Sequence, residues 1–109
     1  MFANDFDITP QQLKIQLDQS ADLMLLDIRE LFEYEICRLP GAKLIPMNEI
    51  PTRLTELPRE QSIVVYCHAG VRSARVVAWL RHQGFDNAQN LAGGIDAWSC
   101  EIDPYVPRY

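Results

Sequence analysis

The stretch SIVVYCHAGVRSARVVAWLRHQG, residues 62–84, decides the fold expected for the whole chain. Its first part, residues 62–66, is rich in β-branched side chains and predicts a buried strand. In residues 73–83 apolar side chains recur at helical spacing, and Gly84 follows where a C-terminal cap is expected. A strand that leads into a helix in this way predicts an α/β protein, with residues 67–72 as the connecting loop.

The remainder of the chain repeats this alternation of strands and helices. Residues 23–28 (LMLLDI) form a near-continuous apolar run, which is typical of a strand buried on both faces. Residues 48–57 carry apolar side chains at helical spacing and predict a helix that ends before Pro58. Further strands are expected at 6–8, 42–45 and 87–91, and further helices at 10–17, 29–35 and 94–98. The pattern predicts an α/β fold in which helices flank both faces of a small, mainly parallel sheet.

Length and composition limit what the chain can do. Its 109 residues predict a single domain, residues 1–109, whose tail (103–109) packs along the surface or hangs free. Ten basic and fifteen acidic residues give a net charge of −5, which argues against nucleic acid or an anionic membrane as partner. No stretch has the length and apolar character of a membrane span, and the first ten residues do not resemble a signal peptide. We therefore expect a cytoplasmic protein.

The chain has three cysteines, Cys37, Cys67 and Cys100. A low, odd number at scattered positions is unlike a secreted disulfide framework, and none has the spacing of a metal site. Free thiols in a reducing compartment fit this pattern better. Cys37 and Cys100 are expected to be incidental, the alternative being that they are resolving thiols that attack an intermediate on Cys67.

The loop at residues 67–73 (CHAGVRS) concentrates the chemistry. Ligands of parallel α/β sheets bind at the carboxyl ends of strands, and the start of a helix offers unpaired N–H groups and a partial positive charge. Gly70 allows a positive φ angle, and Arg72 adds a planar cation that suits an oxyanion. These features favour the thiolate form of Cys67, which is the nucleophilic form. The alternative is an inert core cysteine, but such a thiol has no need of the Gly, Arg and Ser that follow.

Three motifs make the chain resemble the rhodanese family. The first is DIR at 27–29 with EY at 33–34 and LPGA at 39–42, the second is CxxGxRS at 67–73, and the third is LxGGIxxW at 91–98. They occur in the family's order and together span residues 27–98. The chain departs from the first motif at residues 37–39, where it has CRL and the family usually has Gly-His-Ile.

The resemblance implies a thiosulfate sulfurtransferase that works by covalent catalysis. Cys67 is the implied catalytic residue: it takes a sulfane sulfur from a small anionic donor such as thiosulfate, or from a persulfide, and holds it as a persulfide. The acceptor is a thiol, cyanide or a protein, and no metal or organic cofactor is implied. The implied substrate-binding residues are the rest of the loop: His68, Ala69, Gly70, Val71, Arg72 and Ser73.

Other interpretations stay open. Asp27 and Arg29 follow a predicted strand and are candidates to support the loop, the alternative being a purely structural ion pair. Residues 98–107 (WSCEIDPYVP) resemble the end of rhodanese domains fused to adenylyltransferases, which favours a sulfur-relay module with a protein donor or acceptor. A phosphatase is disfavoured, since four residues separate Cys67 from Arg72 where the related cysteine phosphatases have five. A non-catalytic binding domain is disfavoured because the cysteine is present.

Overall fold

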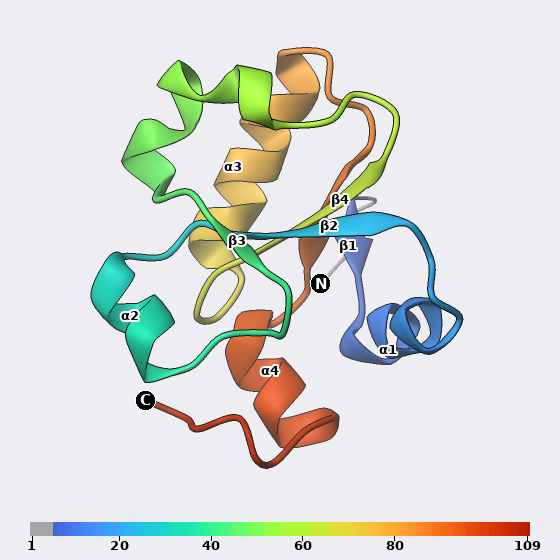
Figure 1. Ribbon diagram of the computed structural model, residues 1–109, viewed down its shortest axis with the longest axis vertical. Helices are drawn as coiled ribbons and strands as arrows, with labels where there is room; N and C mark the ends of the chain where they lie inside the picture. Colours follow the sequence, from blue (N-terminus) through green and yellow to red (C-terminus); the bar gives the residue numbers. More distant parts are fainter. Residues whose placement is uncertain (1–5) are drawn as a thin grey trace.

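Within residues 6–109, which the computed structural model describes, five parallel strands form one sheet (Figure 1). The strands are β1 (Asp7–Ile8), β2 (Leu23–Asp27), β3 (Lys43–Leu44), β4 (Ser62–Tyr66) and β5 (Ala88–Leu91). Their order in the sheet is β1-β5-β4-β2-β3, so β4 lies in the centre, and every neighbouring pair is parallel. The predicted fold class is confirmed.

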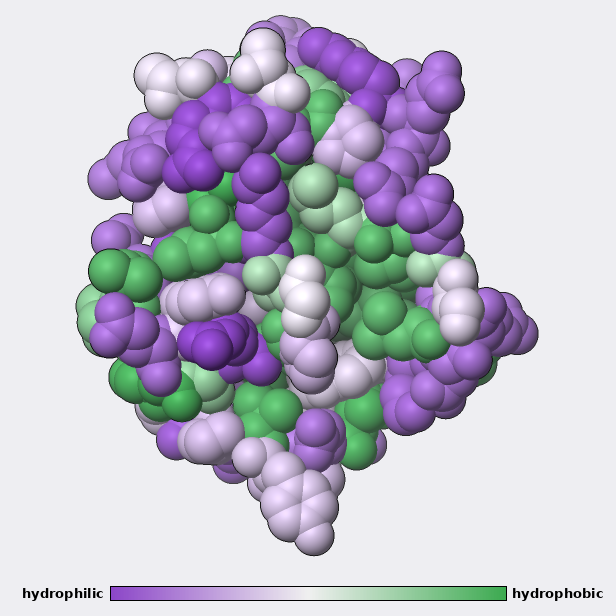
Figure 2. Space-filling view, in the orientation of Figure 1, coloured by the Kyte–Doolittle hydropathy of each residue, from purple (hydrophilic) through white to green (hydrophobic). Residues whose placement is uncertain are grey.

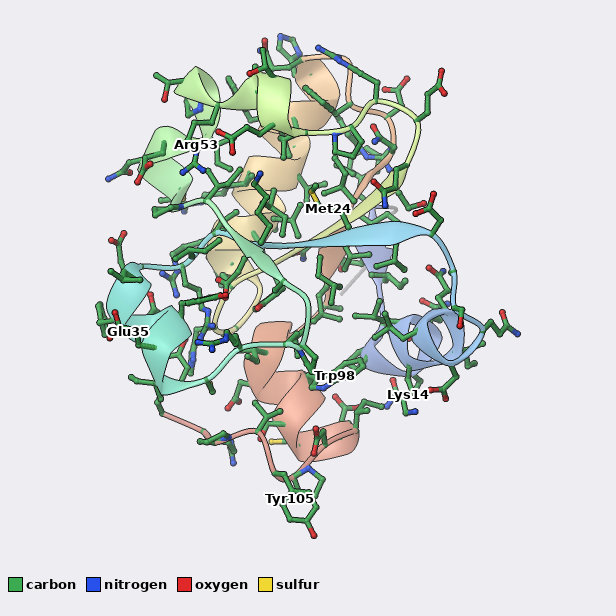
Figure 3. The ribbon with its side chains drawn as sticks, viewed as in Figure 1. Lys14, Met24, Glu35, Arg53, Trp98 and Tyr105 are labelled. Atoms are coloured by element: carbon green, nitrogen blue, oxygen red, sulfur yellow. The ribbon has the colours of Figure 1, made fainter. Side chains whose placement is uncertain are left out.

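Helices cover both faces of the sheet, as Figure 1 shows. On one face, α3 (Val71–His82) packs with two 3₁₀ helices, η1 (Met47–Thr52) and η2 (Leu54–Glu56), over a core that includes Val65 and Leu80. On the other face lie α1 (Pro10–Asp18) and α4 (Gly94–Glu101), and Trp98 of α4 points toward α1 (Figure 3). A short helix, α2 (Leu31–Ile36), follows β2. None of the helices in the described part of the chain has the length and apolar composition of a membrane span.

Local sequence signals explain where several helices begin and end. Thr9 caps α1: its hydroxyl accepts from the Gln12 N–H, and the Gln12 side chain accepts from the Thr9 N–H. Gly84 has φ +93° just after α3, as expected of a glycine that ends a helix.

The helix predicted over residues 48–57 is wrong in type, because this segment forms η1 and η2 instead. Pro51 lies inside η1, where it has no N–H to donate and its ring crowds the preceding turn. The segment is closed by shorter i to i+3 hydrogen bonds, such as the 3.0 Å bond from the Arg53 N–H to the Ile50 carbonyl.

The parallel arrangement brings the loops after β2, β4 and β5 to one edge of the sheet. The last residues of the chain return to this edge, where the C-terminus lies beside α2 (Figure 1). Val106 in this tail is buried, and its carbonyl accepts a hydrogen bond from the Ser99 hydroxyl of α4. The tail therefore packs against α4 and contributes to the edge that carries the predicted loop.

Candidate active site around Cys67

Cys67 directly follows β4, and its sulfur lies at the N-terminus of the twelve-residue helix α3. The Sγ atom accepts hydrogen bonds from the backbone N–H groups of Gly70 at 3.1 Å and Ser73 at 3.4 Å. Gly70 precedes α3 with φ +95°, the left-handed conformation that turns its N–H toward the sulfur. The loop thus aims two N–H donors and the positive end of a helix at one sulfur atom, an arrangement that stabilises negative charge there.

The sulfur is recessed within this loop. Cys67 is 1% exposed, whereas Ala69 and Val71, further along the loop, are exposed. A reagent must therefore present a small terminal atom to reach Sγ. This burial differs from that of an inert core thiol because the sulfur has polar hydrogen-bond donors around it.

The start of α4 is hydrogen-bonded to the backbone of the Cys67 loop. The Ile95 N–H donates to the Cys67 carbonyl at 2.9 Å, and the Asp96 N–H donates to the His68 carbonyl at 3.0 Å. Gly94 permits this contact, since a Cβ built at this position would lie 2.5 Å from the His68 carbonyl oxygen and 2.6 Å from that of Cys67. The start of α4 and the Cys67 loop are thus packed backbone against backbone.

Replacing Gly94 by alanine is expected to displace the Cys67 loop. The added methyl group forces apart two backbone segments, and overpacking of this kind costs about 1–3 kcal/mol of folding free energy. Gly41→Ala is the matched control, because Gly41 also has positive φ but a Cβ there meets nothing within 4 Å. We expect urea unfolding to show a larger loss for Gly94→Ala, and the alkylation rate of Cys67 to change in that variant alone. Equal losses and unchanged alkylation in both would contradict this packing argument.

Arg72 is paired with a residue of α2. Its two Nη groups donate to the two carboxylate oxygens of Glu33 at 2.9 and 3.0 Å. These hydrogen bonds lower the pKa of Glu33 to about 2, and Glu33 raises the pKa of Arg72 in turn. Arg72 therefore ties the loop to α2, with its charge balanced by a carboxylate. Direct binding of an anionic donor by Arg72 stays a prediction.

Asp27 and Arg29 form a fully buried ion pair under this edge of the sheet. The Arg29 Nε and Nη2 donate to the two Asp27 oxygens at 2.9 and 2.7 Å, and both side chains are 0% exposed. The Tyr66 hydroxyl donates to Asp27 at 2.8 Å, and Arg29 also donates to the Cys37 carbonyl at 2.6 Å. No hydrogen bond joins this pair directly to the Cys67 sulfur among the described residues, and support of the loop by Asp27 and Arg29 stays a prediction.

Tyr109, which the sequence did not single out, links these two ion pairs. Its hydroxyl accepts from the Arg29 Nη1 at 2.7 Å and donates to Glu33 at 2.7 Å. Its ring lies edge-on to the His68 ring, with centroids 4.3 Å apart. The half-buried His68 imidazole thus packs against the tail, and its buried Nδ1 has no hydrogen-bond partner among the described residues. The tail closes one side of the active-site loop.

Tyr109→Phe is expected to weaken the attachment of the tail to Arg29 and to Glu33 of α2. A hydrogen bond to a charged group contributes roughly 1.5–3 kcal/mol, so the variant should lose about that much unfolding free energy at neutral pH. In the folded protein the pKa of Glu33 is lowered from an ordinary 4.5 to about 2. The stability that ionised Glu33 contributes is therefore complete above pH 4.5 and is lost as the pH falls toward 2. The difference in unfolding free energy between wild type and Tyr109→Phe should therefore shrink as the pH falls over that range.

Urea unfolding from neutral pH down to about 3 measures this effect. Tyr105→Phe is the control, since Tyr105 is 92% exposed and points away from the protein at the turn of the tail (Figure 3). Equal stability of the two variants would contradict the bridging role of Tyr109.

No hydrogen bond joins the thiol of either of the other two cysteines to the Cys67 loop within residues 6–109. Cys37 is buried and Cys100 exposed, and both are free thiols. Within residues 6–109 no three His, Cys, Asp or Glu side chains cluster in a way that could hold a metal ion. The described chemistry is therefore centred on Cys67.

This fold, with a cysteine cradled at the start of the helix after its central strand, belongs to a known class. The chain is a member of the rhodanese family: residues 9–101 match the rhodanese-like domain. Its structure is similar to that of a rhodanese-like domain protein from Staphylococcus aureus, with a TM-score of 0.82 and 36% identity over 94% of this chain and 97% of that one.

Two relatives show the contexts in which such domains occur. A protein named "Sulfurtransferase" from Allochromatium vinosum is 38% identical over 92% of this chain and 94% of that protein. The Mycobacterium tuberculosis protein named "Probable adenylyltransferase/sulfurtransferase MoeZ" is 39% identical over 94% of this chain. The present chain spans only 26% of that larger relative.

Proposed function

We propose that this protein is a sulfurtransferase that carries sulfane sulfur as a persulfide on Cys67. The observation that supports this most is the pair of N–H groups, from Gly70 and Ser73, that point at the Cys67 sulfur from the start of α3. They stabilise a sulfur anion before reaction and a persulfide after it. The family membership and the sulfurtransferase name of the Allochromatium vinosum relative support the same activity.

The proposed reaction has two half-reactions. The Cys67 thiolate attacks the outer sulfur of the donor, the bond from that sulfur to the rest of the donor breaks, and the leaving group departs with the electron pair. With thiosulfate the leaving group is sulfite, and Cys67 is left as a persulfide anion. An acceptor thiolate or cyanide then attacks the outer sulfur, which restores the Cys67 thiolate. This sequence needs no metal or organic cofactor.

A sulfur relay with a protein donor or acceptor is the more specific proposal. Glu33 balances the charge of Arg72. Arg72 is therefore not an unpaired cation that could bind a small dianion at the loop. Exposed apolar residues lie beside it instead: Leu31 and Phe32 on α2 and Val71 on the loop are 56, 65 and 64% exposed. Figure 2 shows apolar surface over α2 on this face. An apolar rim with balanced charges suits a protein surface better than thiosulfate.

Comparing two donors tests the proposal. Sulfur transfer to cyanide is measured with thiosulfate and with a persulfide carried on a purified cysteine desulfurase. We expect turnover with both, and a higher kcat/KM with the protein persulfide. Leu31→Ser and Phe32→Ser should lower kcat/KM for the protein donor alone. Turnover with thiosulfate only would refute the relay, and turnover with neither would refute the sulfurtransferase function. We also propose a cytoplasmic location, because the three cysteines are free thiols, as is usual in a reducing compartment.

A further inference from the structure

The Ser73 hydroxyl lies between two groups that can each accept its proton. Its Oγ is 3.3 Å from the Cys67 sulfur and 2.5 Å from the Asn90 Oδ1. A hydroxyl has one proton, so Ser73 can donate to only one of the two at a time. Ser73 is 0% and Asn90 4% exposed, so water cannot readily replace the bond that is not made.

The neighbours of Asn90 decide which bond Ser73 makes. The Asn90 Nδ2 faces the Asp7 carboxylate at 3.1 Å and the Gly70 carbonyl at 3.5 Å, and both of these groups only accept hydrogen bonds. The amide nitrogen must therefore lie on their side, and the amide oxygen must face Ser73. In this orientation Asn90 needs a donor, and the Ser73 hydroxyl is the donor within reach.

This arrangement has a consequence for the Cys67 sulfur. While Ser73 donates to Asn90, its oxygen presents lone pairs to Sγ and can accept from the thiol S–H. A thiolate has no proton to give and would face those lone pairs. To donate to the thiolate, the Ser73 hydroxyl must turn away from Asn90 and leave the buried Oδ1 without its donor, which is costly. A Cys67 persulfide avoids this conflict in part, since its negative charge lies on the outer sulfur.

We propose that Asn90, oriented by Asp7, is a positioning residue that holds the Ser73 proton away from Cys67 and so opposes the stabilisation of the thiolate by the loop N–H groups. Ionisation of Cys67 releases its proton to solvent and turns the Ser73 hydroxyl from Asn90 to the sulfur. Formation of the persulfide lets the hydroxyl return. The proposal rests on the proposed function only in taking Cys67 as the reacting thiol.

Other ionisable groups lie on the elements around the Cys67 loop and must stay constant in a test. They lie on the loop and the start of α3, on α2, α4, the tail and β1, and at the end of β2 and just after it: His68, Arg72, Glu33, Asp96, Tyr109, Asp7, Asp27 and Arg29. Asn90→Ala leaves all of these charges in place. Asp7→Ala removes one of them, and so acts on Cys67 through space as well as through Asn90.

Alkylation of Cys67 by uncharged iodoacetamide as a function of pH tests the proposal without any sulfur donor, and peptide mapping assigns the label to Cys67. In Asn90→Ala the Ser73 proton is free to bond the thiolate, so we expect alkylation at pH 7 to be roughly three- to tenfold faster. The pH at half-maximal rate should also fall. Asp7→Ala, which leaves only the 3.5 Å contact to orient the amide, should show a smaller increase. Gln89→Ala, on the neighbouring position of β5, is the control and should leave the rate unchanged.

The Ser73→Ala background separates this network from other causes. Without the Ser73 hydroxyl, Asn90→Ala should not change the alkylation rate of Cys67. Asp7→Ala should then change the rate only through the loss of its charge. An unchanged or slower rate in folded Asn90→Ala, or an increase that persists without Ser73, would overturn the proposal. If Asn90→Ala does not fold, Asp7→Ala tests the proposal instead. The increase in alkylation rate that it causes must then be smaller in the Ser73→Ala background than in wild type. Alkylation that follows these expectations without sulfur transfer would refute the proposed function and leave this inference intact.

Discussion

Cys67→Ser is expected to abolish sulfur transfer while the fold is retained. Serine cannot form a persulfide, and loss of a covalent nucleophile lowers turnover by at least about a thousandfold. The serine oxygen can still accept from the Gly70 and Ser73 N–H groups, so the loop keeps its hydrogen bonds. The measurement is turnover with the better of the two donors, alongside thermal unfolding.

Two further cysteine variants serve as controls. Cys100→Ser changes an exposed thiol and Cys37→Ser a buried one, and neither touches the Cys67 loop in the described hydrogen-bond network. Both should keep near wild-type turnover. Near wild-type turnover in Cys67→Ser would mean that the sulfur is carried elsewhere, and a comparable loss in Cys100→Ser would mean that Cys67 does not act alone.

Arg29→Met is expected to produce the largest loss of stability. It leaves the Asp27 carboxylate buried without its ionic partner, although the Tyr66 hydroxyl still donates to it. Removing one member of a buried ion pair costs about 3–5 kcal/mol, because the remaining charge is uncompensated. The free energy of unfolding in urea at pH 7 measures the loss.

Arg53→Met is the matched control for Arg29→Met. Arg53 pairs with Glu49 and Glu56 on the 3₁₀ segment at the surface, where Figure 3 places it far from α4. Exposed pairs of this kind contribute little to stability, because water screens them. A loss for Arg29→Met no larger than that for Arg53→Met would show that the buried pair is not what stabilises this edge of the sheet.

The sequence was sufficient to predict the fold because its signals are local. β4 has the predicted bounds, since its β-branched residues 63–65 favour a strand, and the Thr9 cap fixes the start of α1. The helix predicted over residues 48–57 failed for a local reason too. Apolar spacing cannot distinguish an α-helix from consecutive 3₁₀ turns, and Pro51 selects the latter.

The site could be predicted only in part, because some of its members come from distant segments. The structure places the predicted Cys67 loop at the start of α3, but the partners of that loop were missed. Glu33 lies in a motif that was noticed, yet nothing in its spacing shows that it pairs with Arg72. Asn90 and Tyr109 reach the site through the sheet order and the returning tail. Contacts between residues so far apart in the chain have no signal in one sequence.

Intact mass spectrometry after incubation with a sulfur donor tests the central claim, a Cys67 persulfide, most directly. Wild type is mixed with thiosulfate or with the desulfurase persulfide, beside Cys67→Ser, and each sample is then treated with cyanide. We predict one added sulfur atom on wild type, mapped to Cys67, removed by cyanide and absent from the variant. No added sulfur with either donor, or sulfur mapped to Cys37 or Cys100, would contradict the claim.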